Sequence, residues 1–309
     1  MYAVIATHVI TTATQIAIRV FATGNMQKSI SIIVKPNYAC NAACLHCSIS
    51  NDIADILRPL GVSESIKNVV AFAEMISGES IGTINIIMHG GEPMLHRASY
   101  INEMAYLLEK TLPTIEIKYS IQTNLLAYNQ SWKSILKNVF AWNVSSSYDF
   151  YSSFRQTKDG SDYFSVWYDK VKQYQDDSGR RLYTICVLSR ENIEQAEDII
   201  EQAYIYGLDI KLNMLYSAGK AQDIANNPFI THEEYCDALI RAYRTWKKYD
   251  NTGYVFVQGK DMENIAMQGR SMGCPYTSSC VGNIFCLLPN GDIYQCGECA
   301  DAKQFYYGN

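Results

Sequence analysis

The sequence has no long apolar run, no block of basic residues and no marked excess of charge of either sign. Its 309 residues carry a formal net charge of −5, and only 18% of them are charged. A mildly acidic chain has no electrostatic attraction for nucleic acid or anionic lipid, which argues against both as partners. No stretch reaches the roughly 18 consecutive apolar residues that a membrane-spanning helix requires.

The N-terminus lacks the cationic start of a secretory signal peptide. His8, Gln15 and Arg19, together with several threonines, interrupt its apolar residues. Residues 1–28 are therefore predicted to form a β-rich extension and not a targeting segment. We expect a cytoplasmic protein on this basis.

From residue 29 onward, short β-rich runs alternate with longer amphipathic runs. Ile193, Ala196 and Ile199, for example, recur at helical spacing. Repeated strand–helix units predict an α/β fold with a parallel sheet, and six units fit a partial (β/α)6 barrel of the TIM type. The expected strands are residues 29–35, 84–89, 115–123, 140–147, 182–189 and 209–215. The expected helices are residues 52–78, 98–112, 130–138, 161–176 and 191–206.

The pattern changes after the sixth unit. Residues 231–248 predict a further helix, because Thr231 and Glu234 have the spacing of a capping box. The stretch "LLPNGDIYQC" predicts two strands around a Pro-Asn-Gly-Asp turn. The expected division is an N-terminal extension (1–28), a barrel core (29–218), a helical bridge (219–269) and a small cysteine-rich domain (270–309).

The chain contains ten cysteines, and most of them are clustered. Small secreted proteins use many cysteines for disulfides, but this chain is neither small nor visibly exported, so the clusters indicate metal binding. Cys40, Cys44 and Cys47 have the spacing C-x3-C-x2-C. Three thiolates can hold three irons of a four-iron cluster and leave the fourth iron open to a small molecule. A chance cluster of buried cysteines is the alternative.

The motif "CNAACLHC" resembles the cluster-binding motif of the radical S-adenosylmethionine (SAM) enzymes. In that family a [4Fe–4S] cluster binds SAM at its open iron and yields a 5′-deoxyadenosyl radical, which removes hydrogen from substrate. The resemblance covers about residues 29–218 and implies a SAM-binding cluster on Cys40, Cys44 and Cys47. His46 departs from the motif, because the family usually has an aromatic residue there. We expect its flat ring to pack over the cluster in the same way.

Gly90, Gly91, Glu92 and Pro93 follow the second expected strand and look like the family's GGEP segment. Paired glycines let the backbone approach a ligand closely. Glu92 or its backbone can accept hydrogen bonds from the ammonium group of SAM. Taken alone, the segment is an ordinary turn with a surface glutamate, but its place downstream of the three cysteines favours the functional interpretation.

Further segments resemble the family in the same order along the chain. "IQTNLL" is similar to its QTNG segment, "SSSYDF" to its SIDG segment, and "LNMLYSAGKA" to the end of its sixth strand. The resemblance implies that Gln122 and Asn124 point into the barrel mouth. It also implies that Ser147 faces the SAM carboxylate, that Asp149 shapes the site, and that Arg155 is a carboxylate partner. The simpler alternatives are a turn cap for Asn124, a helix N-cap for Ser147 and a surface ion pair for Arg155.

The C-terminal cysteines resemble the opening of an auxiliary-cluster domain called SPASM, or of its shorter form, twitch. The resemblance implies that Cys274, Cys280 and Cys296 bind an auxiliary [4Fe–4S] cluster, with Cys299 or a residue beyond 309 as the fourth ligand. A zinc site on Cys274, Cys280, Cys296 and Cys299 is the alternative. The longer cysteine pattern of a full SPASM domain does not follow.

Three cysteines fall outside these ligand sets. Cys286 is expected in the core, with a role as a substitute ligand as the alternative. Cys186 and Cys236 are expected to be buried apolar residues.

Most enzymes that resemble this layout modify peptides, so the implied activity is maturation of a ribosomally made precursor peptide by a cross-link (carbon–carbon, thioether or ether). A peptide epimerase, which needs a hydrogen-donating thiol, is an alternative. A sulfatase-maturing enzyme that forms formylglycine is another, although Gly297 stands where those relatives have an Asp. The implied partners are the precursor peptide and an electron donor such as flavodoxin or ferredoxin. Leader recognition is expected from a separate leader-binding protein, an exposed strand edge or the barrel mouth itself.

Overall fold

The computed structural model describes residues 28–49, 62–78, 80–249, 251–269, 271 and 280–309, so the expected N-terminal extension lies outside the described residues. Six strands lie side by side in chain order, and every neighbouring pair is parallel. They are β1 (Lys28–Val34), β2 (Ile81–Met88), β3 (Glu116–Gln122), β4 (Val144–Ser147), β5 (Leu182–Leu188) and β6 (Leu208–Met214). This arrangement confirms the partial α/β barrel predicted from the sequence.

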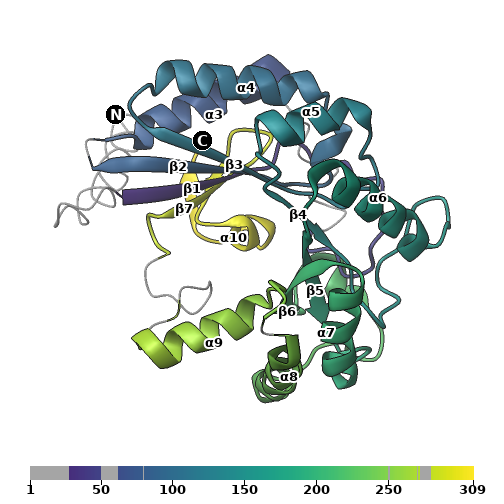
Figure 1. Ribbon diagram of the computed structural model, residues 1–309. Helices are drawn as coiled ribbons and strands as arrows, with labels where there is room; N and C mark the ends of the chain where they lie inside the picture. The colour runs from purple at the N-terminus through teal and green to yellow at the C-terminus, as the bar shows by residue number, and fades with distance from the viewer. Residues whose placement is uncertain (1–27, 50–61, 79, 250, 270, 272–279) are drawn as a thin grey trace.

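Helices cover the outer side of the curved sheet (Figure 1). They are α3 (Val62–Ile76), α4 (Ala98–Thr111), α5 (Gln130–Asn138), α6 (Tyr163–Ser178) and α7 (Ala196–Ile205). Short 3-10 turns occur at Pro93–Leu95, Ile193–Gln195, Gly219–Asp223 and Lys247–Tyr249. In β5, Leu182, Thr184, Cys186 and Leu188 are fully buried, whereas the residues that alternate with them are half-buried. The fully buried side of the sheet packs on the helices and forms the main core, because side chains alternate between the faces of a strand.

Strand β4 is shorter than the expected run of residues 140–147. Ala141 and Trp142 adopt positive φ angles of 49° and 63°, which an extended strand cannot contain. The Trp142 N–H bonds back to the Leu136 carbonyl at 2.7 Å, so α5 ends in a tight turn before the strand begins. The strand predicted from the β-rich composition of this segment is therefore too long.

Two more helices follow the sixth strand, α8 (His232–Trp246) and α9 (Val257–Gln268), of which only α8 was predicted. Its capping box is confirmed: Glu234 N donates to Thr231 Oγ1 at 3.2 Å, and Thr231 N donates to Glu234 Oε2 at 2.7 Å. The prediction that Cys236 is buried was wrong. The buried face of α8 includes Tyr235 and Leu239, and Cys236 is rotated away from it into solvent.

The C-terminal segment extends the same sheet. Strand β7 (Ile284–Leu287) pairs in parallel with β1, and β8 (Ile293–Tyr294) and β9 (Tyr306–Gly308) follow as antiparallel neighbours. The β7–β8 pair confirms the hairpin predicted around the Pro-Asn-Gly-Asp turn. The short helix α10 (Gly297–Asp301) lies within the curve of the sheet (Figure 1). A Cβ on Gly297 would lie 3.6 Å from Ile33 Cδ1, so α10 rests on the inner face of β1.

Among the described residues, no helix is both long enough and apolar enough to cross a lipid bilayer.

Candidate active site

The cysteine loop, defined as residues 36–49, follows β1 at the end of the sheet where the loops after β2, β3, β4 and β6 also converge. Its Cys40, Cys44 and Cys47 are half-buried and free of disulfides. Burial, together with the nearby Glu92, Cys44 and Cys47, raises the pKa of Cys40 to about 11, with the Ala42 N–H opposing. Three thiols that would repel one another as thiolates favour a shared cationic metal group.

Contacts from distant parts of the chain hold the cysteine loop. Leu45 N donates to the Phe154 carbonyl at 2.8 Å, and Lys220 N donates to the Cys47 carbonyl at 2.9 Å. A Cβ on Gly219 would lie only 2.6 Å from the Cys47 carbonyl oxygen, so the segment after β6 presses on the loop. The loop has almost no regular secondary structure, yet its backbone is anchored on several sides.

The paired glycines after β2 lie against the same loop. Gly90 has φ +116°, and a Cβ on it would lie 2.5 Å from the Asn37 carbonyl oxygen. A Cβ on Gly91 would lie 2.1 Å from the Ala39 carbonyl oxygen. Gly91 N and Glu92 N donate to these two carbonyls at 3.0 and 2.7 Å. Only glycine permits this approach, which joins the segment after β2 to the residues just before Cys40.

Glu92 is buried, with only 1% of its surface exposed, so the alternative of a surface glutamate is wrong. Its Oε1 accepts hydrogen bonds from Met94 N at 2.8 Å and Thr123 Oγ1 at 2.6 Å, and its Oε2 accepts one from Asn124 N at 2.7 Å. Burial raises the pKa of Glu92 to about 7 against the opposing effect of these donors. The carboxylate therefore joins the loops after β2 and β3.

Asn124 both caps a turn and contacts the cysteine loop. Its Oδ1 accepts a hydrogen bond from Leu126 N at 2.9 Å, which is the turn-capping role. Its Nδ2 donates to Asn41 Oδ1 at 2.7 Å and lies 3.6 Å from Cys40 Sγ. Ala42 N is a second donor to the same sulfur, at 3.4 Å. Donors of this kind favour the thiolate form of Cys40 and suit a sulfur that binds metal.

Gln122 and Ser147 are brought together on the inner face of the sheet. Gln122 Nε2 donates to Ser147 Oγ at 2.8 Å, and Ser145 Oγ donates to Gln122 Oε1. Ser147 ends β4, whereas the N-cap of the next helix is Asp162. The helix-cap alternative for Ser147 is therefore wrong.

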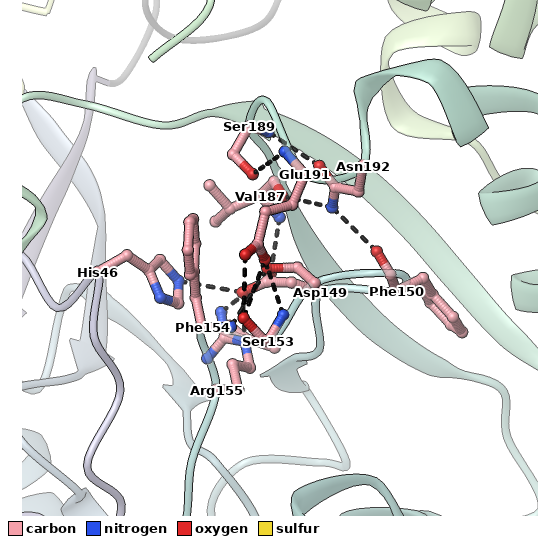
Figure 2. Close-up of polar contacts among 12 residues, drawn as sticks. His46, Asp149, Phe150, Ser153, Phe154, Arg155, Val187, Ser189, Glu191 and Asn192 are labelled. Atoms are coloured by element: carbon pink, nitrogen blue, oxygen red, sulfur yellow. Dashed lines mark hydrogen bonds and ion pairs between the residues drawn. The ribbon is translucent and has the colours of Figure 1, made fainter. Parts of the chain in front are cut away.

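Asp149 is the centre of a buried polar network beside the cysteine loop (Figure 2). Its Oδ2 lies 3.0 Å from His46 Nε2 and 2.8 Å from Arg155 Nε, and its Oδ1 accepts a hydrogen bond from Val187 N at 2.8 Å. Burial alone would raise the pKa of Asp149, but Arg155, His46 and the Val187 N–H outweigh it and lower the pKa to about 2. His46, adjacent to Cys47, is thereby tied to the loop after β4.

Arg155 pairs with a carboxylate of the chain itself, Asp149, and its role as a partner of the SAM carboxylate stays a prediction. The side chain is 12% exposed, so the alternative of a surface ion pair is wrong. Burial lowers the pKa of Arg155, but the Asp149 carboxylate more than offsets this effect and raises the pKa. The guanidinium therefore stays charged at the mouth of the barrel.

The C-terminal cysteines gather at the hairpin. Cys296 Sγ and Cys299 Sγ are 3.4 Å apart, well beyond the roughly 2.05 Å of a disulfide. Burial raises the pKa of Tyr307, and charge on Cys299, Cys280 and Cys296 acts in the same direction. The Tyr307 hydroxyl donates to Gln295 Oε1. Gln295 Nε2 also donates to the Cys280 carbonyl at 2.9 Å.

The remaining cysteines have different positions. Cys274 lies outside the described residues, and its assignment stays a prediction. Cys286 and Cys186 are both fully buried in apolar surroundings, as predicted. Among the residues that the structure describes, no three His, Cys, Asp or Glu side chains lie close enough to hold one metal ion. In a four-iron cluster each thiolate binds its own iron, so the free thiols of the cysteine loop fit a cluster better than a single ion.

One contact beside the cysteine loop was missed at the sequence level. Lys35, the residue between β1 and the loop, lies 2.5 Å from Asp301 at the end of α10. The only signal was a charged residue placed directly between an apolar strand and the first cysteine motif.

Comparisons with known proteins agree on the fold. Residues 34–203 match the model of the Radical SAM superfamily. The structure of anSMEcpe with bound AdoMet and Kp18Cys peptide has a TM-score of 0.74 and 18% identity, over 91% of this chain and 77% of that chain. Streptococcus suis SuiB bound to precursor peptide SuiA has a TM-score of 0.58 and 14% identity, over 91% of this chain and 62% of that chain. This chain therefore spans less than two thirds of SuiB. No curated protein sequence matches significantly.

Proposed function

The chain belongs to the radical SAM superfamily, and we propose that it is a peptide maturase that installs a cross-link in a ribosomally made precursor. Membership implies an enzyme that uses a [4Fe–4S] cluster and SAM. Both structural neighbours described above were crystallised with a peptide, which supports a peptide as substrate. The observation that carries the proposal is the anchored loop with three free thiols, Cys40, Cys44 and Cys47.

In this proposal the three thiolates hold the cluster and leave one iron open. When bound, the cluster and SAM supply a 5′-deoxyadenosyl radical that removes a hydrogen atom from the peptide. Asn124 and Ala42 direct N–H groups at Cys40 Sγ and orient this ligand. The contacts that anchor the loop keep the geometry fixed during the reaction.

The groups proposed to bind SAM line the same mouth. Because the Glu92 carboxylate is buried among its own donors, the backbone of Gly90, Gly91, Glu92 and Pro93 is left to meet the SAM ammonium. Arg155 supplies a fixed positive charge for the SAM carboxylate.

One hydroxyl group and two side-chain amides complete the proposed SAM site. Gln122 orients Ser147, whose hydroxyl is free to donate to the SAM carboxylate. Asn124 fixes the loop after β3 against the cysteine loop.

We assign an auxiliary [4Fe–4S] cluster to Cys280, Cys296, Cys299 and Cys274. The support is the 3.4 Å approach of Cys296 Sγ to Cys299 Sγ and the hydrogen bond from Gln295 to the Cys280 carbonyl, on an element that rests on the inner face of the barrel. A second redox group at this place can accept the electron that remains when a cross-link forms. A flavodoxin or ferredoxin would supply electrons, and a separate protein would bind the leader of the precursor.

Formylglycine formation is the second candidate function, and one observation supports it. That reaction needs a base near the second cluster, and Gly297 lacks one. Glu298 is the next residue, on α10, and partial desolvation of its carboxylate raises its pKa, with Lys211 and Lys35 opposing. Its carboxylate could serve in place of the missing Asp. Epimerisation needs a thiol that donates hydrogen, for which Cys286, Cys299 and Cys236 are the candidates. It has weaker support, because Cys286 is buried, Cys236 is exposed to solvent on α8, and Cys299 is assigned to the auxiliary cluster.

Anaerobic co-expression with a candidate precursor peptide tests the proposal, with the mass of the peptide as readout. A cross-link removes two hydrogen atoms, epimerisation leaves the mass unchanged, and formylglycine has its own mass signature. We expect the loss of two hydrogen atoms, and none when Cys44 is replaced by alanine. Failure to bind or change any peptide would contradict the maturase assignment.

A further inference from the structure

A buried ion pair connects the two groups of cysteines. Lys35 Nζ lies 2.5 Å from Asp301 Oδ1, and the two side chains are only 1% and 6% exposed. Ser48 Oγ donates to the other carboxylate oxygen at 2.8 Å, and Lys35 Nζ also donates to the Gly297 carbonyl at 3.2 Å. Lys35, Asp301 and Ser48 are called the latch below.

The positions of the latch residues give it a place in the site. Lys35 directly precedes the cysteine loop, and Ser48 follows Cys47 within it. Asp301 ends α10, the helix that begins after Cys296 and contains Cys299. One carboxylate therefore holds both ends of the first cysteine motif against the element that carries the second group.

A small apolar core surrounds the latch. Tyr38 and Ile49 of the cysteine loop pack with Leu288, Tyr294 and Ala300 of the C-terminal segment. Cys47 packs against the same cluster, and so does Ile33 of β1. An apolar contact thus runs between the two cysteine groups, and the buried Lys35–Asp301 pair beside it is costly unless its geometry is maintained.

The carboxylate does not serve its own helix. Asp301 is at the C-terminal end of α10, where the helix dipole disfavours a negative charge. The helix is also too short for its own hydrogen bonds to maintain it. Its orientation therefore depends on the latch and on the apolar contacts around it.

We propose that Asp301 is a positioning residue that couples the two cysteine groups, so that the state of the C-terminal group alters SAM binding at the cysteine loop. Only the part of the proposal that concerns SAM binding rests on the proposed function. A shift of α10 moves Asp301, and with it Ser48 and the backbone next to Cys47. The coupling is reciprocal, because each group changes the other through the same contact.

The first test uses the protein without metal and needs no assumption about activity. Asp301→Asn keeps the shape of the side chain but removes the charge that holds Lys35. We expect Cys47 to be alkylated about tenfold faster in this variant, as measured by mass spectrometry of the cysteine peptides, because local opening becomes easier. An unchanged rate would overturn the proposal.

The chain contains a matched control pair. Lys133 Nζ lies 2.5 Å from Asp177 Oδ1, and Tyr128 donates its hydroxyl to the other carboxylate oxygen at 2.8 Å. Asp177→Asn removes a Lys–Asp–hydroxyl contact of the same form, away from both cysteine groups. Alkylation of Cys47 should not change in this control. An equal acceleration would show a general loss of stability and would overturn the proposal.

The second test uses protein with clusters. Cys296→Ala disables the C-terminal group, and the SAM dissociation constant is measured with and without Asp301→Asn. We expect each single change to weaken SAM binding by about fivefold to tenfold, and the double variant to be no weaker than either. Effects that multiply, or no effect of Asp301→Asn, would overturn the proposal. A wild-type protein that forms no cluster would instead contradict the proposed function and leave the alkylation test valid.

Discussion

The cysteine loop and the C-terminal cysteines differ in where their supporting hydrogen bonds come from. The loop receives its backbone contacts from residues far away in the sequence, such as Phe154 and Lys220. The C-terminal group is supported mainly by close neighbours: Ala300 N bonds to the Cys296 carbonyl at 3.0 Å, and Gln304 N bonds to the Cys299 carbonyl at 2.8 Å. The pairing of β7 with β1, the latch and its apolar surroundings join this group to the barrel.

The difference indicates how each site is organised before any cofactor binds. A loop anchored by tertiary contacts is preorganised by the folding of the barrel. A local cluster on a short hairpin and a five-residue helix gains less order from folding, so metal binding supplies more of it. Four changes test this comparison, and they are ordered from the largest expected effect to the smallest.

The largest effect is expected from Cys44→Ala. One of three cluster ligands is lost, so reductive cleavage of SAM should fall to the background rate, while the anchored loop keeps the protein folded. SAM cleavage is measured by chromatography, and folding by circular dichroism. Cys236→Ala, on the exposed face of α8, is the control and should retain full activity. Substantial cleavage by the Cys44 variant would remove this loop from the site.

Cys280→Ala should distinguish the role of the cysteine loop from that of the C-terminal cysteines. SAM cleavage is expected to persist, whereas the modified peptide disappears and about four irons per chain are lost, the content of one cubane cluster. Iron analysis and peptide mass spectrometry on one preparation give both results. Full iron content in this variant would refute the auxiliary-ligand assignment.

Gly91→Ala should damage the anchored loop through the backbone alone. The new Cβ would lie 2.1 Å from the Ala39 carbonyl oxygen, and relief of this overlap should cost about 3 kcal/mol of unfolding free energy. Gly78→Ala is the matched control, because a Cβ there meets nothing within 4 Å. Chemical denaturation of the metal-free variants measures both. Equal stability of the two would show that the segment after β2 does not press on the cysteine loop.

Asp149→Asn should change how stability depends on pH. The lowered pKa of Asp149, about 2 against an ordinary value of 3.8, gives stability that is fully present above pH 3.8. This contribution, roughly 2 kcal/mol, is lost as the pH falls towards 2. The variant should therefore lose less stability than the wild type over this range. Parallel curves from denaturation at a series of pH values would contradict the assignment.

The barrel could be predicted from the sequence because its signals are local. Five of the six parallel strands were predicted to within about three residues, since each pairs a β-rich run with a following amphipathic helix. The motifs also fell at the carboxyl ends of the strands, where Glu92 bonds to Asn124 and Asp149 contacts His46 of the cysteine loop.

What the sequence could not supply are contacts between distant segments. The pairing of β7 with β1, and the bond between Lys35 and Asp301, join residues from opposite ends of the chain. The Glu92 side chain looked free to bind a ligand, because nothing local shows that three donors from two loops surround it. The alternation of apolar residues along a strand indicates which face of the sheet is buried, but it does not indicate which segment covers the opposite face.

The most direct test of the central claim isolates the cysteine loop in a variant with Cys280, Cys296 and Cys299 all replaced by alanine. This protein is reconstituted with iron and sulfide, reduced, and examined by electron paramagnetic resonance before and after SAM is added. The account predicts one [4Fe–4S] signal, with g values that shift when SAM binds the open iron. A protein with no cluster signal, or with a signal that SAM leaves unchanged, would contradict it.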